Sequence, residues 1–198
     1  MLGVFLGKSL MFEIQNCCLI VVDVQGKLAR LMHDKDTLFK NIEILIKSAK
    51  ILNIPILWCQ QCPESLGPTI PQIARLLSGI EPINKASFSC CGSDQFKTRL
   101  TELAQKHVPE CLCRGQILLC GIEAHVCIYQ TAMDLIGQGY EVEFVSDAIS
   151  SRTAENKQAA ITKMTAAGAK LTTTEMALFE LLKTADHPQF KQIAKLIK

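Results

Sequence analysis

One short stretch, residues 17–24, constrains the fold most: CCLIVVDV is continuously apolar except for a carboxylate near its end. A strand that alternates apolar and polar residues has one wet face, whereas an unbroken apolar run predicts burial on both faces. Two further segments, PILWC at 55–59 and QILLC at 116–120, have the same character. Strands of this kind are typical of parallel sheets that are covered by helices on both sides.

Segments with helical spacing of apolar residues separate these strands. Helices are expected at 38–53, 95–106, 124–138, 156–167, 174–182 and 188–197, with a helical turn at 73–77. Shorter strands are expected at 82–89, 141–145 and 169–172. The alternation predicts an α/β fold of Rossmann type, in which a mostly parallel sheet forms the middle of three layers. We expect a single domain over 1–198, with 1–16 as an N-terminal extension or edge segment.

Charge and composition narrow the classes of partner. Lys and Arg total 21 and Asp and Glu total 19, and no basic run is interleaved with aromatic residues. This pattern argues against a nucleic-acid partner and against a ribonuclease. The apolar start of the chain is too short to span a membrane. Ten cysteines in a chain of this length, without a convincing signal peptide, predict a reduced, cytoplasmic protein, and a mitochondrial location stays open.

Reactive side chains stand where the predicted strands end, which is where open α/β sheets place their sites. Asp23 ends the first strand, Lys85 lies in INKAS, and Cys127 lies six residues beyond Gly121 at the start of a predicted helix. A helix N-terminus and a nearby ammonium both favour a thiolate. A carboxylate can shuttle the proton, and main-chain amides can hold an oxyanion. These groups together predict a cysteine nucleophile with an acid/base and a cation.

Other interpretations of these residues remain open at this stage. A cysteine is often a buried core residue, and a lysine is usually a solvated surface residue. Cys59 and Cys62 form a C-x-x-C pair, which favours a loop over a zinc or redox site because further ligands at suitable spacing are missing. His125 either lines the pocket or is a loop residue. Phe88 is either a pocket wall or part of the core.

The same residues resemble the isochorismatase-like superfamily of cysteine hydrolases. The family pattern is D-x-Q after the first strand, a mid-chain Lys, and G-[IV]-x-x-x-x-C; here it reads Asp23-Val24-Gln25, Lys85 and GIEAHVC at 121–127. Segments such as CPESLGPTIPQ and VSDAISSR are similar to the short isochorismatase domain-containing proteins of eukaryotes. The resemblance implies a sheet of about six strands and a triad of Asp23, Lys85 and Cys127. It also implies a cis peptide bond between Ile122 and Glu123, with the amides of Glu123 and Cys127 as the oxyanion hole.

The resemblance implies a function as well. Metal-binding relatives carry His and Asp after the second strand, and LWCQQCPESLGPTIPQ contains neither, so neither a metal nor a cofactor is expected. We expect a hydrolase of a small molecule, acting on an amide-type C–N bond, an ester or a vinyl ether. Pocket residues are expected to be Gln25, Phe88, Ile122 and His125. The family's habit of assembly implies a homo-oligomer, and the alternative function is an interaction protein that has lost turnover.

Overall fold

The computed structural model describes residues 11–105 and 115–198. Its strands are β1 (Cys17–Val22), β2 (Ile56–Gln61), β3 (Ile83–Lys85), β4 (Gln116–Ile122), β5 (Glu141–Ser150) and β6 (Lys170–Thr172). They form one sheet in the order β3-β2-β1-β4-β5-β6, and every pairing is parallel. The predicted α/β fold with a parallel sheet of six strands is therefore confirmed.

Helices and short turns connect the strands. The α-helices are α1 (Gly26–Arg30), α2 (Lys35–Ile51), α3 (Pro63–Leu66), α4 (Pro71–Ala74), α5 (Asp94–Gln105), α6 (Tyr129–Gly137), α7 (Ala154–Ala166), α8 (Thr174–Leu182) and α9 (Phe190–Ile197). The tighter or wider turns are the 3-10 segments η1 (Ile14–Asn16), η2 (Arg75–Leu77) and η3 (Cys90–Gly92), and the π-helical η4 (Ala124–Ile128). The N-terminal segment predicted at 1–16 is described from Met11 onward.

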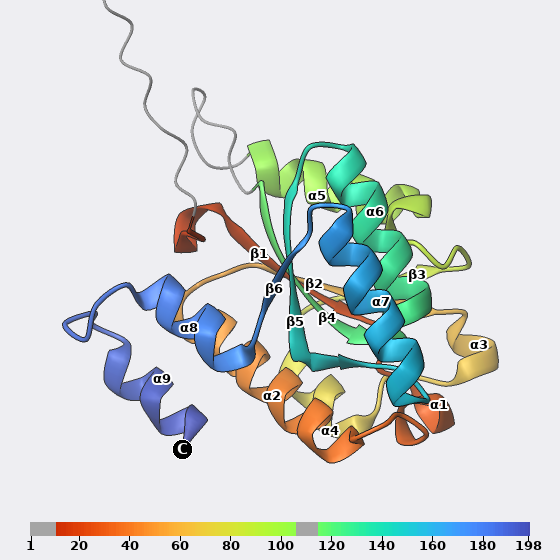
Figure 1. Cartoon of the computed structure of the whole chain (residues 1–198), viewed down its shortest axis with the longest axis horizontal. Coiled ribbons are helices and arrows are strands. Elements are labelled where there is room, and N and C mark those ends of the chain that lie inside the picture. The colour runs from red at the N-terminus through yellow and green to blue at the C-terminus, as the bar shows by residue number, and fades with distance from the viewer. Residues whose placement is uncertain (1–10, 106–114) are drawn as a thin grey trace, which may run out of the picture.

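Helices cover both faces of the sheet and bury two cores (Figure 1). Helices α2, α8 and α9 pack on one face, and α5, α6 and α7 pack on the other. Successive residues of β1 point to opposite faces, so Leu19 joins the first core and Ile20 the second. This two-sided burial explains why β1 is a continuous apolar run.

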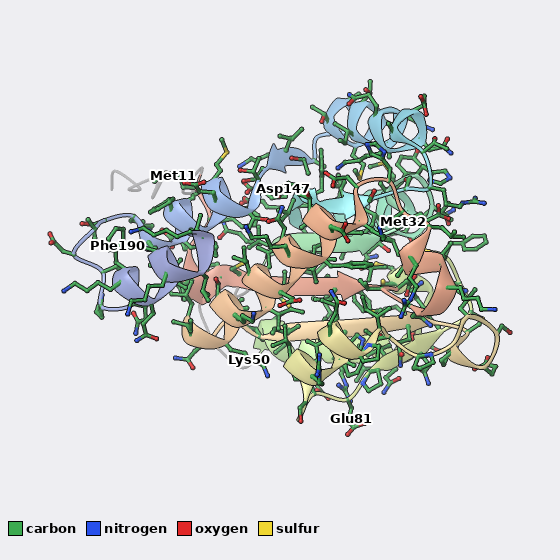
Figure 2. The ribbon with its side chains drawn as sticks, turned by 90° about the horizontal axis from the view of Figure 1, so that it is seen from below. Met11, Met32, Lys50, Glu81, Asp147 and Phe190 are labelled. Carbon is green, nitrogen blue, oxygen red and sulfur yellow. The ribbon has the colours of Figure 1, made fainter. Side chains whose placement is uncertain are left out.

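The two ends of the sheet differ in what they carry. Figure 2 shows Met11 and Phe190 at one end of the molecule and Met32 toward the other. At the amino ends of the strands, the main-chain N–H of Glu13 donates to Oε1 of Gln116 at 2.8 Å. At the carboxyl ends, the N–H of His33 donates to the carbonyl of Ser151 at 2.8 Å. The N-terminal segment is thus anchored far from the edge where the reactive residues lie.

Two predicted segments differ from the structure in an informative way. Strand β5 runs five residues beyond the predicted 141–145, because its pairing with β4 shifts register between Leu119 and Gly121. The helix predicted at 124–138 begins as the π-helical turn η4 and continues as α6. Within the described ranges, no helix combines the length and the apolar character that crossing a membrane requires.

Candidate active site

Four polar or thiol side chains meet at the carboxyl edge of the sheet. Asp23 follows β1, Gln61 ends β2, Lys85 ends β3, and Cys127 lies in η4 directly after β4. Since β2, β1 and β4 are neighbours in the sheet, their ends converge on one point. The structure therefore brings together the three reactive residues that the sequence predicts, and it adds Gln61.

Lys85 is the most completely bonded of these residues. Its ammonium donates to Oδ2 of Asp23 at 2.7 Å and to Oε1 of Gln61 at 2.8 Å. It also lies 3.1 Å from the carbonyl of Phe88 and 3.2 Å from that of Ser87. Burial lowers the pKa of Lys85 and is the largest single effect, but the charge and hydrogen bond of Asp23, with smaller contributions from Cys90 and Cys127, together raise the pKa above its ordinary value. The amine therefore stays charged, and all of its protons are directed at protein acceptors.

Asp23 holds its position through the backbone. It leaves β1 in the left-handed conformation, with φ 53°, and its N–H donates to the carbonyl of Cys59 at 3.1 Å. Burial raises the pKa of its carboxyl above the ordinary value, against the opposing effect of Lys85. Oδ2 binds Lys85, whereas Oδ1 is buried without a hydrogen-bond partner among the described residues. One oxygen of Asp23 is thus available to accept a proton.

The thiol of Cys127 differs in one respect from the sequence expectation. Burial raises its pKa, the charge of Asp23 raises it further, and the charge of Lys85 lowers it by less. The expectation that the helix terminus and the ammonium produce a thiolate is wrong in direction, because Cys127 is buried and Lys85 is already neutralised by Asp23. The resting thiol is therefore protonated, and it lies close enough to Asp23 for each to shift the pKa of the other.

The chain between β4 and η4 has the backbone geometry that the resemblance implies. The peptide bond between Ile122 and Glu123 is cis. Gly121 has φ 121°, and a Cβ at this position would overlap the main chain of Val22. Only glycine combines this conformation with such a close approach to β1. Glycine at 121 thus lets β4 lie against the end of β1, where Asp23 follows.

Glu123 and Arg152 form an ion pair beside the thiol. Oε1 of Glu123 lies 3.0 Å from Nε of Arg152 and 3.3 Å from its main-chain N. The Glu123 side chain is 9% exposed, whereas that of Arg152 is 56% exposed. The carboxylate of Glu123 is therefore buried in the protein, whereas the guanidinium of Arg152 lies at the surface.

A small cavity of about 90 Å³ opens onto these groups. Asp23, Gln61, Glu123 and Cys127 supply its polar lining. The rest of its lining is apolar and comes from Leu28, Leu66, Phe88, Ile122 and Val126. Lys85, which is paired with Asp23, does not line the cavity, so the lining residues include one cysteine and two acidic residues among apolar ones.

Two residues that the sequence places in the pocket do not line this cavity, whereas Phe88 and Ile122 do. The buried amide of Gln25 donates to the carbonyls of Gln61 and Gly67 at 3.0 and 2.7 Å and accepts from the N–H of Gln61 at 2.6 Å. It therefore fixes the loop after β2. The His125 ring lies 2.9 Å from the hydroxyl of Ser151, beside the end of β5.

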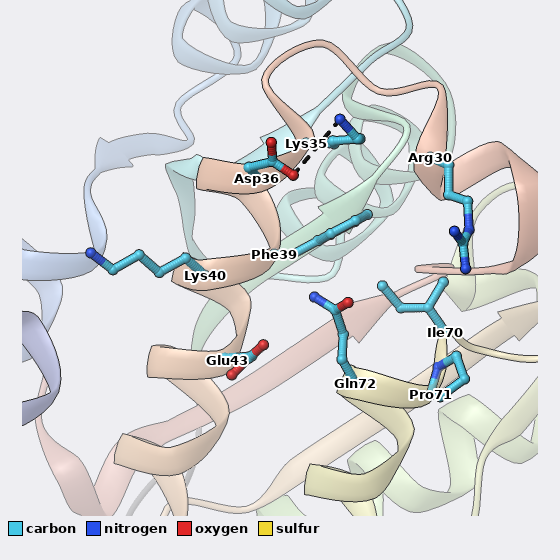
Figure 3. A pocket seen from close by; sticks show the side chains of 9 residues that line it. All are labelled: Arg30, Lys35, Asp36, Phe39, Lys40, Glu43, Ile70, Pro71 and Gln72. Atoms are coloured by element: carbon cyan, nitrogen blue, oxygen red, sulfur yellow. Dashed lines mark ion pairs between the residues drawn. The ribbon is translucent and has the colours of Figure 1, made fainter.

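A larger cavity of about 420 Å³ lies elsewhere, between α2 and the segment at Ile70 (Figure 3). Its lining residues are Arg30, Lys35, Asp36, Phe39, Lys40, Glu43, Ile70, Pro71 and Gln72, and they include no thiol or imidazole. In the part of the chain that the structure describes, no group of three or more His, Cys, Asp or Glu side chains could hold a metal ion. Of these two cavities, the small one is therefore the one that holds the cysteine and the Asp23 residue predicted from the sequence.

Comparison with known proteins identifies the family. A model of the isochorismatase domain matches residues 17–176. The chain belongs to the isochorismatase domain family. Isochorismatase domain-containing protein 2 of Danio rerio is 36% identical over 179 residues, which cover 90% of this chain and 85% of that protein. The secreted isochorismatase effector Isc1 of Phytophthora sojae is 36% identical over 183 residues, covering 91% and 83%.

Solved structures of similar proteins share the fold. The MAR1 ribonuclease of Caenorhabditis elegans is 35% identical, with a TM-score of 0.84 over 94% of this chain and 92% of that one. The YcaC gene product of Escherichia coli, described as an octameric hydrolase of unknown specificity, has a TM-score of 0.85 at 20% identity, covering 96% and 91%.

Proposed function

We propose that this chain is a cofactor-free hydrolase of a small molecule, with Cys127 as nucleophile, Asp23 as acid/base and Lys85 as the cation that holds Asp23. The observation that carries this proposal is the cavity that Cys127 and Asp23 both line, together with the Asp23 oxygen that has no hydrogen-bond partner among the described residues. The preferred bond is the C–N bond of an amide, and esters or vinyl ethers are the alternatives.

The first half of the proposed reaction transfers an acyl group to sulfur. Asp23 accepts the thiol proton as Sγ of Cys127 attacks the carbonyl carbon, so that an S–C bond forms. A carboxylate with a raised pKa suits this step, because it is a stronger base than an ordinary Asp. The protonated Asp23 then gives its proton to the leaving nitrogen as the C–N bond breaks, and a thioester remains.

The second half restores the enzyme. Asp23 takes a proton from water while the water oxygen attacks the thioester, and the S–C bond breaks as Cys127 regains its proton. In both halves the main-chain amides of Glu123 and Cys127 are proposed to hold the oxyanion. Lys85 does not touch the substrate in this scheme. Its contact with Oδ2 holds Asp23 in place and keeps the pair neutral, and its three other oxygen contacts hold the ammonium itself.

Charge argues against RNA as the substrate, although several structural relatives are named ribonucleases or putative ribonucleases. Phosphate is recognised by cations, and among the described residues that line the small cavity there is none. A cavity of about 90 Å³ also suits a molecule of only a few non-hydrogen atoms. These two features support a small-molecule substrate.

The decisive experiment compares turnover of small amides and esters by the wild type, Cys127→Ala and Cys91→Ala. Cys91 is also buried on the same side of the sheet but does not line the cavity, so its variant is the matched control. We expect Cys127→Ala to lose at least about a thousandfold in kcat and Cys91→Ala to keep activity. Intact-mass measurement during turnover should detect an acyl adduct on the wild type alone.

An interaction protein without turnover is the competing function. It predicts no hydrolysis of any tested substrate and no acyl adduct, with unchanged folding of Cys127→Ala.

The expected homo-oligomer is a separate proposal, supported by Phe88, which lines the cavity yet is 54% exposed. Light scattering on the purified chain measures the mass of the assembly directly.

A further inference from the structure

The charges around the small cavity are arranged asymmetrically. Asp23 and Glu123 both line it, whereas the cation paired with each carboxylate does not. Lys85 lies behind Asp23 with its protons directed at four oxygens, and Arg152 is largely in solvent. The acidic residue of each ion pair thus lines the cavity, and a bound molecule is closer to it than to the basic residue.

The remaining wall cannot compensate an added negative charge. Leu28, Leu66, Phe88, Ile122 and Val126 supply no donor side chain. The amide of Gln61 already donates to the carbonyl of Ala86 at 2.6 Å and accepts from Lys85. The main-chain amides proposed as the oxyanion hole are the donors that remain, and they carry no net charge. An anionic group on the substrate would lose its water near two acidic residues without gaining a cation, which is unfavourable.

Glu123 is the residue that gives the cavity this character. Its Oε1 accepts both hydrogen bonds from Arg152, and no hydrogen bond to Oε2 occurs within the described ranges. A carboxylate oxygen in this position can accept from an amide N–H of a substrate. It repels a carboxylate at the same place.

We infer that Glu123 is a specificity-determining residue, which makes this pocket select uncharged, aliphatic primary amides over anionic ones. The inference rests on the proposed function in treating the selected molecule as a substrate. The charge selectivity itself is a property of the pocket. It can therefore be measured without turnover.

The test uses two alkylating reagents of nearly equal size, iodoacetamide and iodoacetate. Each forms an S–C bond with a thiolate as the C–I bond breaks and iodide leaves, after the thiol proton has passed to the solvent. The rate at Cys127 is measured by peptide mapping, and the ratio of the two rates is divided by the same ratio for glutathione. We expect this normalised preference for iodoacetamide to be at least about tenfold.

Two variants should move the preference in opposite directions. Glu123→Gln removes the negative charge and should lower the preference several-fold, whereas Arg152→Gln removes its counter-ion and should raise it. Glu102→Gln, an exposed carboxylate on α5, is the control and should leave the preference unchanged. Because Arg152 is exposed, its variant should fold, and it tests the role of the Glu123 charge even if Glu123→Gln does not fold. A normalised ratio near one, or variants that leave it unchanged, overturns the inference.

A turnover arm separates this inference from the proposed function. Butyramide and succinamate differ mainly by a terminal methyl against a carboxylate, and ammonia release reports hydrolysis of each. Faster turnover of butyramide supports both ideas. If neither amide is hydrolysed while the labelling preference stands, the amidase proposal fails alone. If succinamate is the better substrate, the specificity inference fails and the hydrolase stands.

Discussion

The ammonium of Lys85 lies 2.7 Å from Oδ2 of Asp23, and the two side chains are 0% and 3% exposed. Such a pair is costly to desolvate, and its components depend on one another. The Gln61 amide and two carbonyls complete the shell around the ammonium. The pair is therefore a structural element of the fold as well as part of the proposed chemistry.

Removal of one partner should destabilise the fold strongly. Lys85→Met leaves the Asp23 carboxylate buried without a cation, and we expect the free energy of unfolding to fall by about 3–5 kcal/mol. Urea denaturation measures this loss. The control is Lys97→Met, which breaks an ion pair to Asp94 whose side chains are 51% and 95% exposed. That variant should lose far less stability than Lys85→Met, because solvent screens an exposed pair, and equal losses would contradict the interpretation.

Asp23→Asn should separate the reactivity of the thiol from turnover. The charge of Asp23 raises the pKa of Cys127, and Asn at this position removes that charge while Lys85 remains. We expect alkylation of Cys127 by iodoacetamide at pH 8 to become faster, on the order of tenfold, because more thiolate is present. Hydrolysis should be lost in the same variant, since the base is gone. Slower alkylation together with lost hydrolysis would indicate damage to the fold instead.

Gly121→Ala tests the close approach of β4 to β1. The added methyl would meet the main chain of Val22, at a φ of 121° that side chains rarely adopt. We expect a loss of about 2–4 kcal/mol in thermal or chemical unfolding. Gly137→Ala is the matched control, because nothing lies within 4 Å of its Cβ position in α6. It should be neutral or stabilise by up to about 1 kcal/mol.

Glu143, in β5, should make stability depend on pH. Burial, with help from Glu180, raises the pKa of Glu143 from 4.5 to about 7. The folded state then holds the proton more tightly than the unfolded state. Its contribution to stability is complete below pH 4.5 and is lost as pH rises to about 7. The free energy of unfolding should thus decline by about 2 kcal/mol over this window because of this group.

Glu143→Gln should remove that decline, so its unfolding free energy should exceed that of the wild type at pH 8 and converge with it near pH 4. Denaturation curves at several pH values measure the difference. The exposed Glu175 supplies the control as Glu175→Gln, for which the two curves should run in parallel. If the Glu143→Gln and wild-type curves run in parallel, burial of Glu143 does not shift its pKa.

The sequence predicts the parts of the site that follow from strand ends. Asp23 comes directly after an unbroken apolar run, so its place at the carboxyl edge follows from periodicity alone. Gln61 was missed because its role depends on the register of neighbouring strands, where it pairs with Lys85. No local pattern in the sequence encodes that register. The available signal was its position two residues after the predicted buried strand at 55–59; in the structure β2 extends to Gln61.

Electrostatic properties were the least predictable. The raised pKa of Cys127 reflects burial and the neutralisation of Lys85 by Asp23, which are tertiary effects. The length of β5 depends on an irregular pairing with β4, which interrupts the periodicity that marks a strand. Sequence patterns thus predict which residues converge, whereas their protonation and their exact partners require the packed structure.

The order of strands gives the molecule one further property. Within the sheet, β2 and β3 are added along one edge of β1, and the chain then returns to add β4, β5 and β6 along the other edge of β1. Asp23 and Lys85 belong to the first portion, and Cys127 belongs to the second. Neither portion holds a thiol and its carboxylate together in the cavity. Any activity from this centre would therefore require that the two portions have docked. A chain divided between β3 and β4 could thus report, through its activity, that the two pieces have associated.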